Sequence, residues 1–363
     1  MKTKTRLATR LATSVSGAAI AAVAAAVLCG GTAYAANVRL LETGSSLLYP
    51  LFNLWVPVYQ KTHQDVQITT QSTGSGTGIS QSISGIAQIG ASDAYLSDAQ
   101  MKSNPEMLNI PLAISSQMVN YNVPGLNKDH LHLSGPVLAD IYEGKVKYWD
   151  DPAIAKMNPG VKLPHNAIIT VHRTDGSGDT FIFTQYLSFS TPEWSKSLGY
   201  GTTVSWPAAA AGAIGAVGNP GMVNATKGTP YSIAYIGISF EKVTDSSGLG
   251  EAALENKDGK FVLPDATTVS AAVSAMASKT PADERISLIF APGPQSYPII
   301  NYEYSILKNK QPSADTAKAL REFLSWGINP KEGSAPHFMK AVGFVALPEA
   351  IVKLSDKQIK EIK

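Results

Sequence analysis

Three short loops of similar composition hold the side chains best suited to chemistry. Glycine lets a backbone approach a ligand closely, and serine and threonine hydroxyls add uncharged hydrogen-bond donors. Each loop follows an apolar run and precedes a helical pattern, which places free backbone N–H groups at the start of a helix. One such loop is usually only a helix cap or a tight turn, but three in one chain suit the binding of a small oxyanion. The loops are Gly44-Ser45-Ser46, Gly74-Ser75-Gly76-Thr77-Gly78 and Gly176-Ser177-Gly178-Asp179-Thr180.

Two charged residues accompany these loops. Arg173 lies just before the third loop, and its guanidinium can meet two oxygens of an anion at once. A structural ion pair, with Asp175 as the partner, is the alternative for Arg173. Asp93 follows the run Gly90-Ala91-Ser92, and its carboxylate would repel an anion unless that anion carries a proton. The alternative for Asp93 is a helix cap.

The spacing of the reactive residues argues against an enzyme. Ser45, Ser75 and Ser177 each lack the glycine two residues earlier that the nucleophile loop of an α/β-hydrolase requires. No loop of the type G-x-x-x-x-G-K-[ST] occurs, so nothing points to ATP. The histidines show no metal-ligand spacing around His172, and we expect His172 to point away from the loops. We therefore predict no catalytic activity, no metal and no cofactor.

The predicted elements alternate between strands and helices. Helical patterns run from the second loop to residue 89, over 180–187 and over 314–327, where the apolar residues share one face. This alternation predicts an α/β chain with mostly parallel sheets. A segment rich in Ala, Gly and Pro, 205–229, predicts a long surface loop. The predicted strands are 66–70, 114–122, 168–171, 233–238 and 299–307.

The N-terminus has the order of a secretory signal. Four basic residues among the first ten are followed by an apolar run at 18–28 and by Ala33-Tyr34-Ala35, a small-residue cleavage site. We therefore predict that residues 1–35 are a signal peptide and that the protein is periplasmic or extracellular. Cys29 offers the alternative of a lipid anchor, which Leu28 disfavours because a lipoprotein signal has a small residue before its cysteine.

The charge balance and the cysteine count exclude further classes of protein. The chain has 30 Lys and Arg against 28 Asp and Glu, but four of the basic residues lie in the predicted signal, so the remainder is slightly acidic. No basic run typical of a nucleic-acid binder occurs. Cys29 is the only cysteine, which excludes a disulfide framework and a cysteine-based metal site. The remaining length is sufficient for two domains.

At the same loops the sequence resembles the periplasmic phosphate-binding proteins of the PstS family. The resemblance implies two α/β lobes of the type II-like periplasmic-binding-protein fold, each a mixed sheet flanked by helices, with a hinge between them. It also implies that one phosphate is clamped between the lobes. We expect residues 36–120 plus 297–363 to form lobe 1 and residues 121–296 to form lobe 2. The matching stretches are Ile89-Gly90-Ala91-Ser92-Asp93-Ala94, IYEGKVKYWDDPAIAKMNPGVKLP (141–164), HRTDGSGDTFIFTQ (172–185) and PIINYEY (298–304).

The resemblance also implies which residues bind the ligand. In the first loop, an alignment on Trp55 gives Ser46 the hydroxyl position with Ser45 and Leu47 beside it, Leu47 contributing its backbone N–H. An alignment on Pro50 would move this contact to Leu48 and Tyr49. The other implied ligands match directly, and they are Ser75, Asp93, Arg173, Ser177 and Gly178.

Asp179 departs from the family version that has threonine at this position. Its backbone N–H can still donate to the ligand. Its carboxylate is either a second acceptor, which would favour the doubly protonated phosphate ion, or a partner of Arg173.

The resemblance implies high-affinity binding of inorganic phosphate and its delivery to the permease of an ABC importer. The implied partners are phosphate and the permease and ATPase subunits of that importer, with no nucleic acid, and we expect a monomer. Two alternatives remain open at this point. One is a binder of another oxyanion, such as sulfate or molybdate, and the other is a secreted phosphoester hydrolase.

Overall fold

The computed structural model describes residues 38–207 and 212–363. The predicted signal peptide, with Cys29 and the cleavage site, lies outside these residues. Within them, no helix combines the length and the hydropathy that a membrane span would need.

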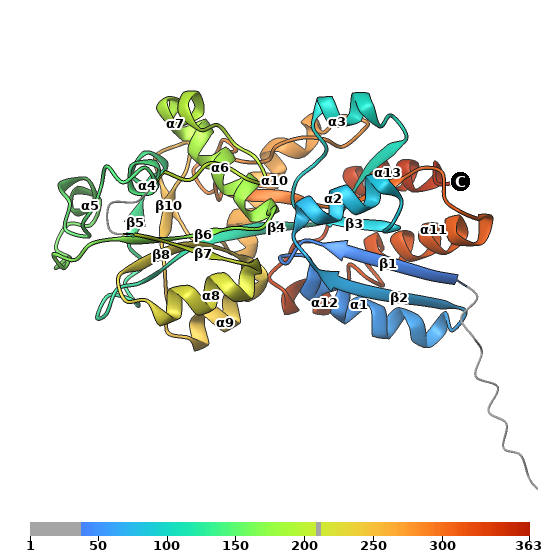
Figure 1. Cartoon of the computed structure of the whole chain (residues 1–363), viewed down its shortest axis with the longest axis horizontal. Helices are drawn as coiled ribbons and strands as arrows, with labels where there is room; N and C mark the ends of the chain where they lie inside the picture. The colour runs from blue at the N-terminus through green and yellow to red at the C-terminus, as the bar shows by residue number, and fades with distance from the viewer. Residues whose placement is uncertain (1–37, 208–211) are drawn as a thin grey trace, which may run out of the picture. The chain divides into compact units, whose positions relative to one another are not determined.

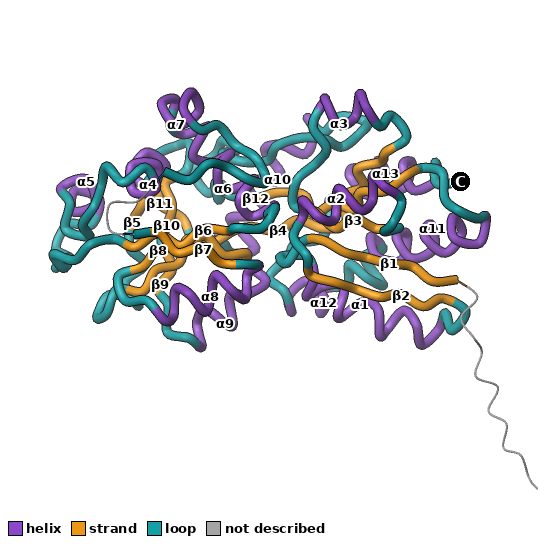
Figure 2. The backbone as a smooth tube through the Cα atoms, viewed as in Figure 1, coloured by secondary structure: helices purple, strands orange, loops and turns teal. Residues whose placement is uncertain are grey.

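A nine-stranded mixed sheet is the framework of the described chain (Figures 1 and 2). Its strand order is β2-β1-β3-β12-β4-β8-β6-β7, and β9 pairs with β4 beside this path. We call the part built on β2, β1, β3 and β12 the first lobe, and the part built on β8, β6 and β7 the second lobe. The strands are β1 (Val38–Gly44), β2 (Val66–Ser72), β3 (Ile89–Ser92), β4 (Met107–Asn122), β6 (Ile169–Arg173), β7 (Ala213–Ala216), β8 (Ser232–Gly237), β9 (Gly250–Glu251) and β12 (Ile300–Lys308).

Strand β4 joins the two lobes. Its residues 107–116 pair antiparallel with β12, and its residues 117–122 pair antiparallel with β8. The outer strands of each lobe are parallel, because β1 pairs parallel with β2 and β3, and β6 pairs parallel with β7 and β8, whereas β12 pairs antiparallel with β3. The predicted α/β fold of two lobes with mixed sheets is confirmed, whereas the expectation of mostly parallel sheets missed the antiparallel strands at the centre.

An aromatic cluster holds the helices of the first lobe against its sheet. Phe52, Trp55 and Tyr59 of α1 pack against Phe323 and Trp326 of α11. Large aromatic rings contribute much buried apolar area, which is the main stabilising term in such a core. The helices of this lobe are α1 (Tyr49–Thr62), α2 (Ser75–Ser84), α3 (Asp98–Ser103), α11 (Ala314–Ile328), α12 (Pro336–Ala341) and α13 (Glu349–Lys360).

The second lobe has its own aromatic core and a small second sheet. Tyr142, Phe183, Trp206 and Tyr235 contact one another. The small sheet consists of β5 (His132–Leu133), β10 (Ala253–Glu255) and β11 (Phe261–Val262). The remaining helices are α4 (Gly135–Tyr142), α5 (Pro152–Met157), α6 (Gly178–Ser190), α7 (Pro192–Ser197), α8 (Gly218–Gly228), η1 (Ile238–Phe240), α9 (Glu241–Ser246), α10 (Ala266–Met276) and η2 (Ala277–Lys279).

Two predicted boundaries were wrong for local reasons. The helix after the second loop ends at Ser84 and not at residue 89, because Gly85 takes a left-handed conformation (φ 77°) that terminates it. Strand β4 begins at Met107, seven residues before the predicted start, since Pro111 interrupts the sequence pattern of a strand. The register of β4 with β12 also shifts beside this proline.

The prediction of a long surface loop over 205–229 was wrong. This segment contains β7, which pairs with β6, and the helix α8. Small residues hid both elements, because Ala and Gly give neither the alternation of a strand nor the apolar stripe of a helix. Pro220 lies in the first turn of α8, where backbone N–H groups have no helical partner and proline is tolerated.

Candidate functional site

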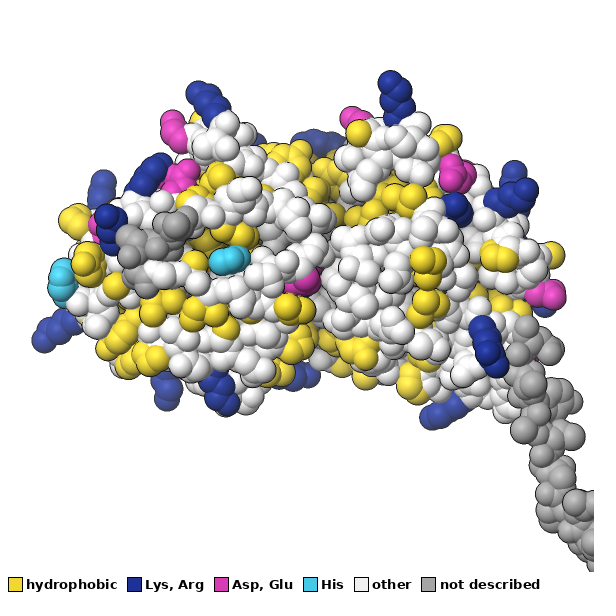
Figure 3. Space-filling model, in the orientation of Figure 1, with side chains coloured by type: hydrophobic (Ala, Val, Ile, Leu, Met, Phe, Trp, Pro, Cys, Tyr) yellow, Lys and Arg dark blue, Asp and Glu magenta, His cyan; other side chains and the backbone are white. Residues whose placement is uncertain are grey.

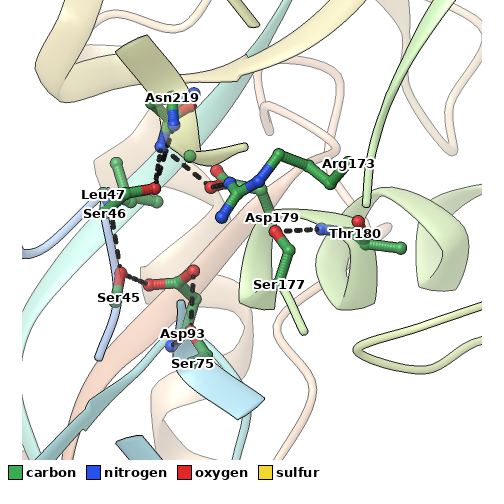
Figure 4. A network of polar contacts seen from close by, with 12 residues as sticks. Ser45, Ser46, Leu47, Ser75, Asp93, Arg173, Ser177, Asp179, Thr180 and Asn219 are labelled. Atoms are coloured by element: carbon green, nitrogen blue, oxygen red, sulfur yellow. Dashed lines mark hydrogen bonds and ion pairs between the residues drawn. The ribbon is translucent and has the colours of Figure 1, made fainter. Parts of the chain in front are cut away.

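The three predicted loops converge between the lobes. They lie at the carboxyl ends of β1, β2 and β6 and at the start of α1, α2 and α6, where open α/β sheets commonly bind ligands. Figure 4 shows residues of both lobes facing one another across this site. All the predicted ligands are buried, and they are Ser45, Ser46, Leu47, Ser75, Asp93, Arg173, Ser177, Gly178 and Asp179.

Asp93 is the centre of the site in the first lobe. Ser45 donates its hydroxyl to Oδ1 of Asp93, and Ser75 donates to Oδ2 at 3.3 Å. The oxygen of Ser45 also accepts the backbone N–H groups of Leu47 and Leu48 at 3.1 and 3.0 Å. Ser45 therefore orders the loop before α1 and orients the carboxylate of Asp93 at the same time.

Arg173 is the cation of the site in the second lobe. Its Nε and Nη2 donate to the two oxygens of Asp175 at 2.7 and 2.5 Å, and its Nη1 donates to Oδ2 of Asp179 at 2.7 Å. The structural pair with Asp175, the alternative considered from the sequence, is therefore present. A guanidinium has five N–H donors. These three bonds leave one N–H on Nη1 and one on Nη2 without a partner among the described residues.

The start of α6 reaches across to the first lobe. Ser177 caps this helix, because its hydroxyl oxygen accepts the backbone N–H of Thr180 at 3.2 Å. The N–H groups of Gly178 and Asp179 belong to the first helical turn and have no partner within the helix. Gly178 lies so close to the first lobe that a Cβ there would come within 2.6 Å of Asp93 Cβ and 2.5 Å of Ser75 Oγ. A second close approach joins the lobes directly, because the N–H of Gly76 donates to the carbonyl of Gly176 at 2.8 Å.

Asn219 links the lobes, although no sequence pattern had identified it as a site residue. Its Nδ2 donates to Ser46 Oγ at 3.0 Å and to Asp179 Oδ2 at 2.8 Å, while its Oδ1 accepts the N–H of Gly237 at 2.8 Å. It is the second residue of α8, inside the segment that we had predicted to be a loop. The only signal that could have revealed it is the sequence Gly218-Asn219-Pro220, which follows β7 and Val217 and begins α8.

Asp179 is paired with Arg173, which is the second of the two alternatives for its carboxylate. Its Oδ1 also accepts Nε2 of Gln117 at 3.1 Å, and the same nitrogen reaches the backbone carbonyl of Asp179 at 3.1 Å. Gln117 is the residue of β4 where the pairing passes from β12 to β8. The acid that departs from the family pattern is therefore bound to the strand that joins the lobes.

Burial and charge set the protonation of the site. Burial, and then the neighbouring charge of Asp93, raise the pKa of Asp179 to about 7. Burial also raises the pKa of Asp93, although hydrogen bonds and the charge of Arg173 oppose this shift. The pKa of Asp175 is lowered in spite of its burial, because the hydrogen bond and the charge of Arg173 favour its ionised form. Asp175 is thus the firm counter-ion of Arg173, and Asp179 holds its charge weakly.

The remaining predicted residues take positions consistent with a binding site. The side chain of Leu47 packs near Gly237 in the second lobe, and its N–H is engaged by Ser45. The ring of His172 lies against Trp206 at 5.4 Å between centroids, away from the carboxylates that hold Arg173. Among the described residues, no cluster of three or more His, Cys, Asp or Glu could hold a metal ion.

A groove of about 610 Å³ lies beside the site. Residues of both lobes line it, including Ile79 and Ile83 of α2 and Phe181 of α6, and it extends to Gly76 next to Ser75. Figure 3 shows hydrophobic side chains gathered in the hollow between the segments that carry α3 and α7. The polar site itself is closed off from solvent, as its buried side chains indicate.

The donors that remain suit a small anion. They are the two N–H groups of Arg173, the backbone N–H groups of Gly178 and Asp179, and the hydrogens of the Ser46 and Ser177 hydroxyls, whose oxygens already accept bonds. Asp93 is the opposite kind of partner, because an ionised carboxylate can only accept. The site therefore combines many donors for an oxyanion with one acceptor for a proton on that anion.

Comparison with known proteins identifies relatives over most of the chain. Residues 30–331 match the family described as PBP superfamily domain. The chain is 38% identical over 344 residues to the phosphate-binding protein PstS of Methanocaldococcus jannaschii, covering 90% of this chain and 87% of that protein. It is 34% identical to the phosphate-binding protein PstS of Pasteurella multocida, covering 88% of this chain and 90% of the relative.

Solved structures share the fold at lower sequence identity. A phosphate-binding protein from Stenotrophomonas maltophilia has a TM-score of 0.66 and 18% identity, covering 88% of this chain and 93% of its own. An ABC-type phosphate transport receptor from Vibrio cholerae has a TM-score of 0.54 and 16% identity, covering 85% of this chain and all of the other. At such low identity these structures show a common fold.

The position of Asn219 generates a test of the contact between the lobes. Asn219→Ala removes three side-chain hydrogen bonds and leaves the buried N–H of Gly237 without an acceptor. We expect the free energy of unfolding to fall by about 1–3 kcal/mol, measured by urea denaturation. The matched control is Asn53→Ala, which removes one exposed bond to Thr70 and should change stability by less than about 0.5 kcal/mol. Equal stability of the two variants would contradict the assigned role of Asn219.

Proposed function

Because this chain belongs to the PstS family of phosphate-binding proteins, we propose that it binds inorganic phosphate outside the cytoplasmic membrane and delivers it to an ABC importer. One observation carries this proposal. Asp93, a buried acceptor oriented by two serines, faces a group of donors that includes Arg173. Phosphate is the common oxyanion that is both negatively charged and able to donate a hydrogen bond at neutral pH.

Each residue has a distinct part in the proposed binding. Arg173 supplies the charge and two N–H donors, while Ser46 and Ser177 supply hydroxyls and Gly178 supplies its backbone N–H. Ser75, also predicted as a ligand, donates its hydroxyl to Asp93 and so helps to orient that acceptor. Ser45 acts on Asp93, since its hydroxyl is donated to that carboxylate. Of the two further predicted ligands, Asp179 would contribute its backbone N–H, because its carboxylate is bonded to Arg173, whereas the N–H of Leu47 already donates to Ser45.

Asp93 gives the site its selectivity. Phosphate at neutral pH carries at least one proton that it can donate to the Asp93 carboxylate, and sulfate carries none. Sulfate would therefore place an oxygen acceptor against a buried acceptor, and such an unmade bond with an uncompensated charge costs several kcal/mol, or roughly 2–5. Discrimination comes from this repulsive mismatch more than from any contact that favours phosphate.

Closure of the lobes is the proposed mechanism. Lobe 1, residues 36–120 plus 297–363, brings the first two loops and Asp93, and lobe 2, residues 121–296, brings Arg173 and the third loop. A ligand that contacts both lobes favours the closed form in proportion to those contacts. The bond between Gly76 and Gly176 and the bridge from Asn219 to Ser46 support a closed form in which the lobes touch directly.

The protein would act by binding alone. Its proposed partners are the permease and ATPase subunits of the importer, which would recognise the closed form of a monomer. The signal peptide at 1–35 and secretion belong to the same proposal, as does the absence of catalysis. The mass of the mature N-terminus would test the cleavage site, and incubation with a chromogenic phosphate ester would test for turnover.

Loss of the cation should abolish tight binding. Arg173→Ala removes two donors and the positive charge, so we expect phosphate affinity to fall by about 100-fold or more, measured by isothermal titration calorimetry. Arg285→Ala is the matched control, because Arg285 is also held by two carboxylates, those of Asp98 and Asp283, and none of its hydrogen bonds reaches the three loops. A similar loss of affinity in both variants would show that Arg173 has only a structural role.

Loss of the selective acceptor should admit sulfate. Asp93→Asn keeps the shape of the side chain but replaces one oxygen acceptor with an N–H donor, so we expect the ratio of phosphate to sulfate affinity to fall by about 10- to 100-fold. Titration calorimetry of both anions at neutral pH measures this ratio. If the unmodified protein bound the two anions equally well, the selectivity argument would be lost.

The approach of Gly178 to the first lobe leads to a further test. Gly178→Ala places a methyl group against Asp93 and Ser75 in the closed form, so the lobes would have to remain apart to avoid the clash. We expect phosphate affinity to fall by about tenfold or more, because overpacking costs about 1–3 kcal/mol, with little change in unfolding. Gly228→Ala is the matched control, since the new Cβ would meet nothing within 4 Å. Gly125→Ala is unsuitable, because Gly125 has a positive φ that strains any other residue. Unchanged affinity in Gly178→Ala would mean that Gly178 does not approach Asp93 when phosphate is bound.

A further inference from the structure

Strand pairing places a second acid directly behind Asp93. Strand β12 runs antiparallel to β3, with Tyr304 opposite Ser92. One step further along the same register, Glu303 is therefore opposite Asp93. The register of β12 with β4 shifts between Glu303 and Tyr304, and such a bulge re-aims side chains beside functional sites.

The surroundings of Glu303 fix its carboxyl group. Its side chain is fully buried, and its Oε1 accepts the hydroxyl of Ser115 at 2.5 Å and Nδ2 of Asn301 at 3.0 Å. Its Oε2 is buried and meets no donor among the described residues. Glu303 and Asp93 lie next to each other, because the same nitrogen, Nδ2 of Asn301, donates to Oε1 of Glu303 and to the backbone carbonyl of Asp93. At 3.3 Å, the bond from Asn301 to Asp93 also ties the two strands at this point.

Two buried carboxyl groups that lie side by side do not readily both ionise, so one of them retains a proton. Asp93 accepts from Ser45 and Ser75 and lies near the charge of Arg173, and all of these favour its ionised form. Among the described residues no cation pairs with Glu303, and burial and then the charge of Asp93 raise its pKa well above the ordinary value. The proton therefore belongs on Glu303, on Oε2, because Oε1 already accepts two hydrogen bonds.

We propose that Glu303 is protonated and donates a hydrogen bond to the carboxylate of Asp93, so that it sets the pH range in which the site prefers phosphate to sulfate. This proposal rests on the proposed function, because it concerns the same acceptor. Glu303 does not touch the ligand. It is a positioning residue that keeps Asp93 ionised and leaves the opposite side of that carboxylate available to a proton on phosphate.

The other charged groups around Glu303 and Asp93 do not compensate a second negative charge at this place. Arg173 and Asp179 of the second lobe face Asp93, and Arg173 is itself bound to Asp175 and Asp179. One cation is thus shared among three carboxylates before any ligand is considered. A charged Glu303 would add a fourth carboxylate, whereas a protonated Glu303 adds a hydrogen-bond donor to Asp93.

Sulfate is the probe that reports on the protonation of Asp93. Sulfate carries no proton between about pH 4 and pH 8, so any pH dependence of its binding reports on the protein. It should bind only where Asp93 is protonated and can donate to it. The experiment is a titration of sulfate by calorimetry across this range for the unmodified protein, Glu303→Gln and Glu303→Leu, with phosphate titrations at each pH.

We expect the two variants to differ in their binding of sulfate and phosphate. Glu303→Leu removes the donor, so the pKa of Asp93 rises and the pH at which sulfate binding appears should move upward by about one to two units. Phosphate affinity should fall in that variant by about 10- to 100-fold at neutral pH. Glu303→Gln keeps an N–H donor to Asp93 and an oxygen acceptor for Ser115 and Asn301, so its sulfate profile and phosphate affinity should stay close to those of the unmodified protein.

Glu284→Gln is the matched control. Glu284 is a fully buried acid whose pKa is raised to about 8, and like Glu303 it is bonded by a serine and a side-chain amide, those of Ser355 and Gln358. Both of these partners belong to α13 and not to the loops, so the substitution should leave both anion profiles unchanged. If Glu303→Leu does not fold, Glu303→Met takes its place, because its unbranched side chain adapts to irregular space.

Three outcomes decide the proposal. A sulfate profile in Glu303→Leu that matches the unmodified protein would overturn it, and so would a shift in Glu303→Gln as large as that in Glu303→Leu, because the proton would then not reside on Glu303. A purely structural role would weaken phosphate binding without moving the pH at which sulfate binds. Failure of the unmodified protein to bind phosphate would instead refute the proposed function, which keeps the two failures distinguishable.

Discussion

The scarcity of positive charge is the constraint on which the site depends. Arg173 is buried in the second lobe with two carboxylates bonded to it, and a third, Asp93, faces it from the first lobe. Buried charges are tolerated only when they are paired and hydrogen-bonded. Hydrogen bonds from the rest of the site satisfy these carboxylates. Serine hydroxyls donate to Asp93, and the side-chain amides of Gln117 and Asn219 donate to Asp179.

This constraint explains why helix starts and strand ends meet here. A helix N-terminus offers backbone N–H groups and a partial positive charge without a further cation. The chain brings the starts of α1, α2 and α6 to one place because β1, β2 and β6 end there. The satisfied carboxylates also join the lobes, since Asn219 bridges Ser46 to Asp179, and Gln117 ties Asp179 to the strand that crosses between them.

Sequence patterns revealed the local parts of this arrangement and not the distant ones. The glycine and serine loops, Arg173 and Asp93 could be identified because each stands in a recognisable strand–loop–helix context. Asn219 could not, because Ala and Gly around it give no periodicity. The partnership of Glu303 with Asp93 depends on the pairing of β12 with β3 across some 200 residues and on a bulge, neither of which has a local signature. The bidentate pairing of Arg173 with Asp175 was foreseen only as an alternative, since spacing alone does not tell an ion pair from a ligand contact.

The excess of acid over base also decides what kind of ligand the site can favour. An anion with no proton would add only acceptors to a site that already has more carboxylates than cations, and the available donors would then be divided among more oxygens. In the proposed binding mode, the oxygens of a protonated anion accept hydrogen bonds from Arg173 and the helix starts, and its own hydrogen is donated to Asp93. Because Asp179 has a pKa of about 7, its charge can diminish when such an anion approaches, which lowers the repulsion further. The proposed selectivity for a protonated oxyanion therefore rests on the balance of buried charges as a whole, with Asp93 as the acceptor for the proton of the ligand.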